Sequence, residues 1–118
     1  MRVLEGEQWM VRIFIGESDR WQGRALSDAL VERLRKEGFA GATVLRGPLG
    51  YGHTSRIHTA KILRLSDDLP LVVEIVETQQ KIDAFLPVLD EMMESGLVTI
   101  EKARVLRYGP NPKTQPAT

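Results

Sequence analysis

The sequence predicts a single α+β domain in which a four-stranded antiparallel sheet carries two helices on one face. Two observations lead to this prediction. Four runs rich in β-branched and aromatic residues alternate with two amphipathic stretches in the order β-α-β-β-α-β, and each amphipathic stretch stops at a glycine. The chain has 118 residues, of which 42% are hydrophobic, so it is long enough for one core and short for two.

The first half of the chain contains one strand, one helix and a second strand. Residues 8–16 form an apolar run that ends at a glycine, which indicates a strand inside the sheet. Ser18 and Asp19 are expected to cap a helix that Gly38 ends. Its apolar positions recur at spacings of three and four and are Ala25, Leu26, Ala29, Leu30 and Leu34. Residues 42–45 follow as the second strand.

The second half repeats this pattern after a longer connection. Residues 54–66 fit neither period cleanly and are expected as an extended hairpin arm, whereas residues 70–77 are a nearly continuous apolar run typical of a buried strand. A second amphipathic helix ends at residues 95–96, and Pro87 within it predicts a kink or a helix start near that proline. Its apolar positions are Ile82, Phe85, Leu86, Leu89, Met92 and Met93. The last strand is expected over 101–107.

This element order is the ferredoxin-like split βαβ topology. Right-handed crossovers place both helices on one face of the sheet and leave the other face open. We expect apolar residues on the open face, including Trp9, Phe14 and part of the run 71–76, with Arg12 near a strand end or in solvent. A bare apolar face of this size favours self-association. Residues 1–8 are expected as a lead-in to the domain at 9–108, and the proline-rich residues 109–118 as a disordered tail.

Composition excludes several classes of function. Sixteen Lys plus Arg balance sixteen Asp plus Glu, so no broad field favours nucleic acid or an anionic membrane. The chain has no cysteine, which excludes disulfides, thiolate metal sites and cysteine nucleophiles. No apolar run approaches the roughly 18 residues of a membrane span, and acids occupy the start where a signal peptide is apolar. We therefore expect a cytoplasmic protein.

The glycine-rich segment at residues 46–53 is the strongest local motif. Glycines let the backbone bring several N–H groups to a phosphate, and Arg46 would add charge. The candidate anion-binding residues here are Arg46, Gly47, Gly50, Tyr51 and Gly52. The segment matches neither the P-loop nor the Rossmann fingerprint. A flexible hairpin connection explains the same composition, so both interpretations stay open.

Other polar residues allow alternatives. Lys102 and Arg104 share one face of the last strand. They are either simply solvated there, or they form a phosphate clamp if another copy of the chain brings them to the glycine-rich segment. His53 and His58 with Glu74 would make a weak metal site, although single hydrogen bonds explain the histidines better. No nucleophile, base and orienting group occur together in the pattern, which predicts that the protein is not an enzyme.

Several motifs, taken in order, resemble the PII-like proteins grouped as domain of unknown function 190. The resemblance covers residues 9 to about 108. The matching motifs are Glu17-Ser18-Asp19, Gly41-Ala42-Thr43-Val44-Leu45-Arg46-Gly47, Gly50-Tyr51-Gly52, Ile57-His58, Asp68-Leu69-Pro70 and Val73-Glu74-Ile75-Val76.

The resemblance implies a fold similar to the nitrogen regulator PII, a homotrimer with nucleotide or small-molecule sites in the clefts between subunits. It places residues 47–59 at the mobile regulatory loop of PII and residues 95–102, with Thr99 and Lys102, at its phosphate-holding loop. The PII loop carries a glycine pair before its lysine, whereas Glu101 precedes Lys102 here. This departure favours AMP or ADP over ATP as the effector.

A signalling protein of this class would regulate a partner protein, and relatives of PII often regulate membrane transporters or channels. Two alternatives follow from the same resemblance. One is a metal-binding trimer related to the cation-tolerance proteins. The other is a ligand-independent accessory subunit of a transporter.

Overall fold

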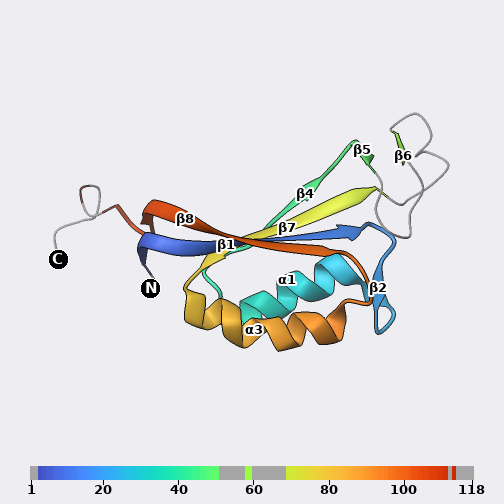
Figure 1. The fold of residues 1–118 in the computed structure, drawn as a ribbon, viewed down its shortest axis with the longest axis horizontal. Coiled ribbons are helices and arrows are strands. Elements are labelled where there is room, and N and C mark those ends of the chain that lie inside the picture. Colours follow the sequence, from blue (N-terminus) through green and yellow to red (C-terminus); the bar gives the residue numbers. More distant parts are fainter. Residues whose placement is uncertain (1–2, 51–57, 60–68, 112, 114–118) are drawn as a thin grey trace.

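A four-stranded antiparallel sheet in the order β4-β7-β1-β8 forms the centre of the computed structural model, which describes residues 3–50, 58–59, 69–111 and 113. Both helices lie on one side of this sheet (Figure 1). The order and the antiparallel pairing confirm the predicted ferredoxin-like topology. The elements are β1 (Leu4–Gly16), α1 (Leu26–Lys36), β4 (Thr43–Arg46), β7 (Pro70–Glu77), α3 (Gln79–Met92) and β8 (Leu97–Tyr108).

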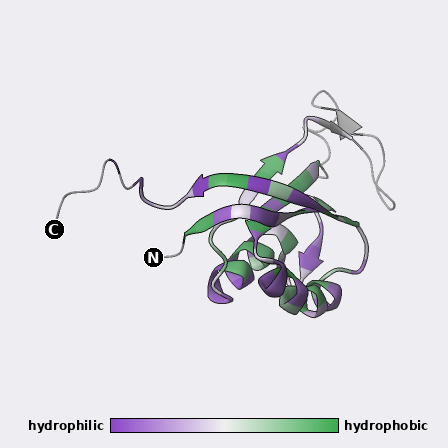
Figure 2. Ribbon diagram, turned by 60° about the vertical axis from the view of Figure 1, so that its left-hand side comes forward, coloured by the Kyte–Doolittle hydropathy of each residue, from purple (hydrophilic) through white to green (hydrophobic). Residues whose placement is uncertain are grey.

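The core fills the space between the two helices and the side of the sheet that faces them. Burial alternates strictly along β7 and along the second half of β1, as expected for strands with one covered face. Figure 2 shows hydrophobic stretches on the strands and on both helices. The core residues are Val11, Ile13, Ile15, Leu26, Ala29, Leu30, Leu34, Leu71, Val73, Ile75, Ile82, Phe85, Leu89 and Met92.

A small hairpin separates β1 from α1. Its strands are β2 (Arg20–Trp21) and β3 (Arg24–Ala25), joined through Gln22 and Gly23, whose φ angles are 50° and 78°. Two consecutive positive φ angles are typical of the tight turns that fit the twist of a hairpin. The predicted helix start therefore lies too early in the chain.

The predicted capping role of Ser18 and Asp19 is wrong. The helix begins at Leu26, and its N-cap residue Ala25 makes no side-chain capping bond. Asp19 instead closes the turn after β1, because its Oδ2 accepts a hydrogen bond from the backbone N–H of Gly16 at 2.9 Å. Its carbonyl oxygen accepts another from the N–H of Leu26 at 2.8 Å.

The helix ends follow the sequence more closely. Gly38 ends α1 with φ 83°, and the N–H of Phe39 donates to the Leu34 carbonyl at 3.0 Å in the Schellman arrangement. At the start of α3, the Thr78 hydroxyl accepts a hydrogen bond from the N–H of Lys81. Pro87 lies inside this helix, so the alternative of a helix start near Pro87 is wrong.

The strands β1 and β8 extend further than predicted. β1 starts at Leu4 rather than Gln8 and pairs with β8 up to Tyr108, so residues 4–8, expected as a lead-in, belong to the sheet. β8 starts at Leu97 rather than Glu101. Two further short strands pair with each other: β5 (Leu49–Gly50) lies in the glycine-rich segment and β6 (His58–Thr59) lies in the expected hairpin arm. The remainder of that arm and most of the tail lie outside the described residues.

The face of the sheet away from the helices, here called the open face, carries one apolar row across all four strands. The register aligns Leu45, Val72, Phe14 and Leu97. Leu45 and Leu97 are 51% and 55% exposed, and no described element of the chain covers this row. Trp9 is not part of the open face, contrary to expectation. It has the opposite parity to Phe14 and packs against the core.

Candidate functional site

One end of the sheet brings together the chain before and after the glycine-rich segment. There the N–H of Glu17 donates to the Leu69 carbonyl and the N–H of Gly47 donates to the Pro70 carbonyl, both at 2.8 Å. These bonds tie the exit of β1 and the exit of β4 to the entrance of β7. We call the described residues 16–19, 46–50 and 69–70 the loop end of the sheet.

Arg46 is the charged candidate at the loop end. It is the last residue of β4, and its guanidinium forms an ion pair with the carboxylate of Glu17. The Arg46 side chain is 60% exposed, so a solvent anion has access to it, whereas Glu17 is 26% exposed. An anion that binds Arg46 would therefore compete with Glu17 for the same guanidinium.

The glycines of this segment have structural partners. The N–H of Gly47 already donates to Pro70, so in this arrangement it does not point at an anion. Gly50 lies in β5, where an added Cβ would come within 2.9 Å of the Pro70 Cγ, and a larger residue would not fit without movement of the ring. Tyr51 and Gly52 lie outside the described residues.

The candidates on β8 do not lie in a loop. Residues 97–102, placed by resemblance at the phosphate-holding loop of PII, are the first half of a continuous strand. Thr99 pairs with Arg12 on the open face. Lys102 lies on the other face, with its Nζ 3.4 Å from Glu7 Oε1 and 5.9 Å from the centroid of the Trp9 ring. Arg104 is the cross-strand neighbour of Glu7 in the register and is exposed.

The structure does not bring the candidates together within one chain. Arg46 belongs to β4 and Lys102 to β8, which are the two opposite edges of the sheet. Three inter-strand spacings separate these edges, which amounts to about 14 Å before any displacement along the strands. Arg46 and Lys102 can hold the same small anion only if they come from different copies of the chain.

A charged cluster on the open face was not predicted as such. The Arg12 Nε lies 3.0 Å from Glu74 Oε2, and its Nη1 lies 2.5 Å from Glu101 Oε1. The hydrogen bonds to Glu74 and then to Glu101 raise the pKa of the Arg12 guanidinium above its usual value. Arg12 lies mid-strand rather than near a strand end, and its side chain is 37% exposed, which agrees with the expected alternative of a solvent position. The cluster depends on the register between β1 and β7, which places Arg12 opposite Glu74. The sequence of either strand alone does not show this register.

The alternative metal site receives no support from the described residues. Among them, no group of three or more His, Asp or Glu side chains could hold a metal ion. Glu74, one of its expected ligands, pairs with Arg12. His53 lies outside the described residues.

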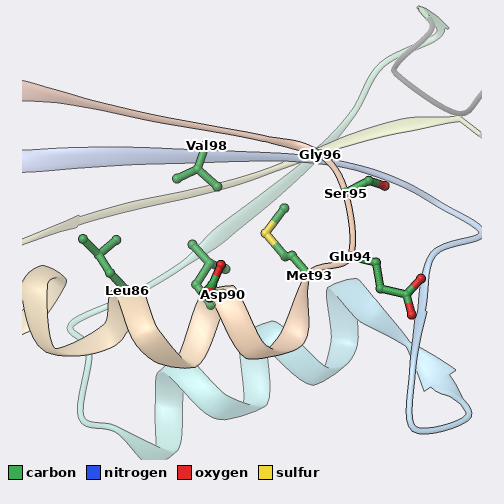
Figure 3. Close-up of a pocket in the computed structure, with 8 residues that line it drawn as sticks. Leu86, Asp90, Met93, Glu94, Ser95, Gly96 and Val98 are labelled. Atoms are coloured by element: carbon green, nitrogen blue, oxygen red, sulfur yellow. The ribbon is translucent and has the colours of Figure 1, made fainter.

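A pocket of about 330 Å³ lies between α3 and the first residues of β8. Figure 3 shows Leu86, Met93 and Val98 around this space, with Asp90 on α3 and Glu94 on the connection that follows the helix. Sequence reasoning placed Met93 in the core and did not predict a cavity, because the distance between α3 and β8 depends on tertiary packing.

No helix within the described part of the chain combines the length and the apolar character that crossing a membrane requires.

The sheet order and the two helices on one face define a ferredoxin-like fold of the kind that PII-like proteins have. The fold is similar to solved structures of CPII, a nitrogen regulatory PII-like protein from Thiomonas intermedia K12. One, bound to ADP, AMP and bicarbonate, has a TM-score of 0.58 at 14% identity, covering 88% of this chain and 91% of that chain. Another, bound to ADP and bicarbonate, has a TM-score of 0.56 at 15% identity with the same coverage.

The chain belongs to the DUF190 family, described as "Uncharacterized ACR, COG1993", which matches residues 8–105. A UPF0166 protein of Aquifex aeolicus is 37% identical over 106 residues, covering 90% of this chain and 98% of the relative. UPF0166 protein MJ1524 of Methanocaldococcus jannaschii is 32% identical over 99 residues, covering 83% and 91%. The resemblance found in the sequence motifs is thus confirmed.

Proposed function

We propose that the protein is a non-enzymatic, PII-like regulator that binds an adenine nucleotide, AMP or ADP, in clefts between the subunits of a homotrimer. The observation that carries this proposal is the position of the basic candidates on opposite edges of the sheet. Arg46 on β4 would meet Lys102 and Arg104 of β8 only across a subunit boundary, since β4 and β8 are opposite edges of the sheet. Clefts between copies would then hold the anion that no single copy encloses.

Self-association has a second source of support in the open face. The apolar row of Leu45, Val72, Phe14 and Leu97 exposes hydrophobic area that a lone subunit leaves in water. Burying such a row between copies stabilises the assembly. In the same assembly the Arg12 cluster would be desolvated as an already paired unit, which limits the cost of burying its charges.

The size of the ligand follows from the charges available. Arg46, Lys102 and Arg104 supply few positive groups for each cleft, which suits one or two phosphates better than three. The CPII structures with the same fold are bound to ADP, with or without AMP. These comparisons support an adenine nucleotide as the ligand class for this chain.

The response to the ligand would begin at Arg46. This residue lies where the chain enters the glycine-rich segment. The N–H of the next residue, Gly47, donates a hydrogen bond to the carbonyl of Pro70, where the connection from β4 to β7 ends. A nucleotide that binds Arg46 would release Glu17 and change the surface offered to a partner protein. The proposal includes a membrane transporter or channel as the partner protein. It also includes a cytoplasmic location.

Calorimetric titration of the assembled protein with AMP, ADP and ATP, with and without bicarbonate, tests the ligand. We expect saturable binding of AMP or ADP, and no heat with any of them at millimolar concentration would refute the proposal. Mixed trimers test the shared cleft. The variants Arg46→Ala and Lys102→Ala should each lose binding, and subunit exchange between them should restore part of it, because some clefts then receive both native side chains.

A further inference from the structure

Leu106 has the most exposed large hydrophobic side chain among the described residues, at 84% exposure. It lies near the end of β8, where alternate residues share a face, so Leu106 lies on the same face as Arg104 and Lys102. A leucine side chain that is exposed to water next to Arg104 and Lys102 contributes nothing to the core of its own chain. The register of β8 against β1 shifts between Val105 and Tyr108, so Leu106 lies at an irregularity of the strand with its side chain in solvent, where it can contact another surface.

The pocket between α3 and β8 has the complementary character. Its apolar floor comes from Leu86, Leu89, Met93 and Val98, and its acidic rim comes from Asp90 and Glu94 (Figure 3). Asp90 lies in the last turn of α3 and Glu94 just beyond the helix, where the helix dipole disfavours negative charge and where the last turn has no basic residue.

Among the described residues, the charges on both surfaces have no ion-pair partner. Across residues 3–50, 58–59, 69–111 and 113, no ion pair involves Asp90, Glu94 or Arg104. The rim is therefore available to a cation, and Arg104 is available to a carboxylate. A neutral chain that separates its charges in this way is electrostatically complementary to a second copy of itself.

Leu106 cannot reach the pocket of its own chain. Val98, in the pocket, and Leu106 lie eight residues apart along the extended strand β8, which places them about 25 Å apart. A contact between these two surfaces must join different copies. Because the two surfaces differ, the contact is head-to-tail, the type that closes into a ring when the rotation fits.

We propose that Leu106 of one copy inserts into the pocket of a neighbouring copy, with Arg104 beside it facing the rim of Asp90 and Glu94. This contact deepens the proposed function, since it rests on the homotrimer and identifies the residues that join adjacent subunits. It also fixes the direction of β8 relative to the neighbour, and β8 carries the basic residues assigned to the cleft.

Sedimentation velocity over a range of protein concentrations tests the contact. The variant Leu106→Glu removes the apolar group, and the double variant Asp90→Lys with Glu94→Lys reverses the charge of the pocket rim. All three positions are exposed or on the pocket rim, so the fold should be kept. Circular dichroism verifies that each variant is folded. Each should weaken association at least tenfold, roughly the effect of one lost leucine contact. Lys36→Gln, on the exposed surface of α1, changes the net charge as much as Leu106→Glu does and should assemble like the wild type.

Mixing the two defective proteins provides the decisive measurement. The Leu106→Glu protein keeps a native pocket and the rim variant keeps a native Leu106, so an equimolar mixture should form a one-to-one complex that neither protein forms alone. A Leu106→Glu protein that assembles like the wild type, a monomeric wild-type protein, or a mixture of folded variants that stays monomeric would each overturn the contact.

The nucleotide titration keeps this inference separate from the proposed function. A trimer that depends on Leu106 and binds no nucleotide supports the contact and refutes the ligand. A Leu106→Glu protein that still assembles and binds AMP or ADP refutes the contact and supports the ligand.

Discussion

The guanidinium of Arg46 at the end of β4 is paired with the carboxylate of Glu17, which follows directly after β1. The two residues lie 29 positions apart in sequence. Their ion pair joins the ends of β1 and β4 at the loop end of the sheet, where the glycine-rich segment begins. An anionic ligand would have to replace Glu17 as the partner of Arg46.

Replacing Arg46 by Gln should weaken nucleotide binding about tenfold, the usual effect of losing one charge-assisted hydrogen bond. Glu17→Gln is the matched variant, because it removes the competing carboxylate and keeps Arg46. It should tighten binding and leave the fold unchanged. Calorimetric titration with AMP and ADP measures both effects, and a Glu17→Gln protein that binds more weakly than the wild type would contradict the competition.

Gly96 should not tolerate a side chain. Its φ is +129°, and an added Cβ would lie 2.7 Å from the Phe14 carbonyl oxygen. Gly96→Ala should therefore lower the free energy of unfolding by about 2–3 kcal/mol. Gly41→Ala is the control, because nothing lies within 4 Å of an added Cβ there, and it should change stability by less than about 0.5 kcal/mol. Urea denaturation measures both, and equal effects would contradict the prediction.

Glu77 is fully buried at the end of β7 and connects two loops. Its Oε1 accepts a hydrogen bond from the Ala40 N–H at 2.9 Å, and its Oε2 accepts one from the Thr78 N–H at 2.8 Å. Glu77→Gln places an NH₂ group against one of these donors and should cost about 1–3 kcal/mol. Thermal denaturation of this variant beside Glu91→Gln, an exposed position on α3, checks the prediction. Loss of stability in both or in neither would be inconsistent with it.

The open face should control assembly through its apolar row. Leu97→Glu introduces a charge beside Phe14 and should shift the protein toward monomers in sedimentation experiments, because an unpaired charge is costly to bury. Lys36→Gln changes the net charge equally on the exposed surface of α1 and should leave the assembly intact. An unchanged trimer in the Leu97→Glu protein would show that the open face is not an interface.

The ion pair between Arg24 and Glu32 should be visible in an acid titration. The hydrogen bond from Arg24 lowers the pKa of the Glu32 carboxyl below its usual value. A lowered pKa means that the pair stabilises the fold above the ordinary glutamate pKa and that this contribution is lost as the pH falls through the lowered value. NMR titration should report the low pKa in the wild type and an ordinary one in Arg24→Gln. Added salt should reduce the difference, since both side chains are exposed.

The element order and the core followed from local patterns. Alternation in β7 and the three-and-four spacing in both helices identified most buried residues, because burial of one face imposes those periods on any sequence with this architecture. Gly38 ended α1 as predicted, since few other residues adopt its positive φ. The start of α1 was wrong because an acidic residue after a strand closes a turn as readily as it caps a helix.

The sequence by itself determined the family, the ferredoxin-like order and a set of polar candidates, because these depend on residue types at short spacing. Only the tertiary structure decided which candidates can act together. Register paired Arg12 with Glu74, folding of the loop end paired Arg46 with Glu17, and strand order separated Arg46 from Lys102. Such relationships depend on contacts between residues far apart in the chain, which no local pattern encodes.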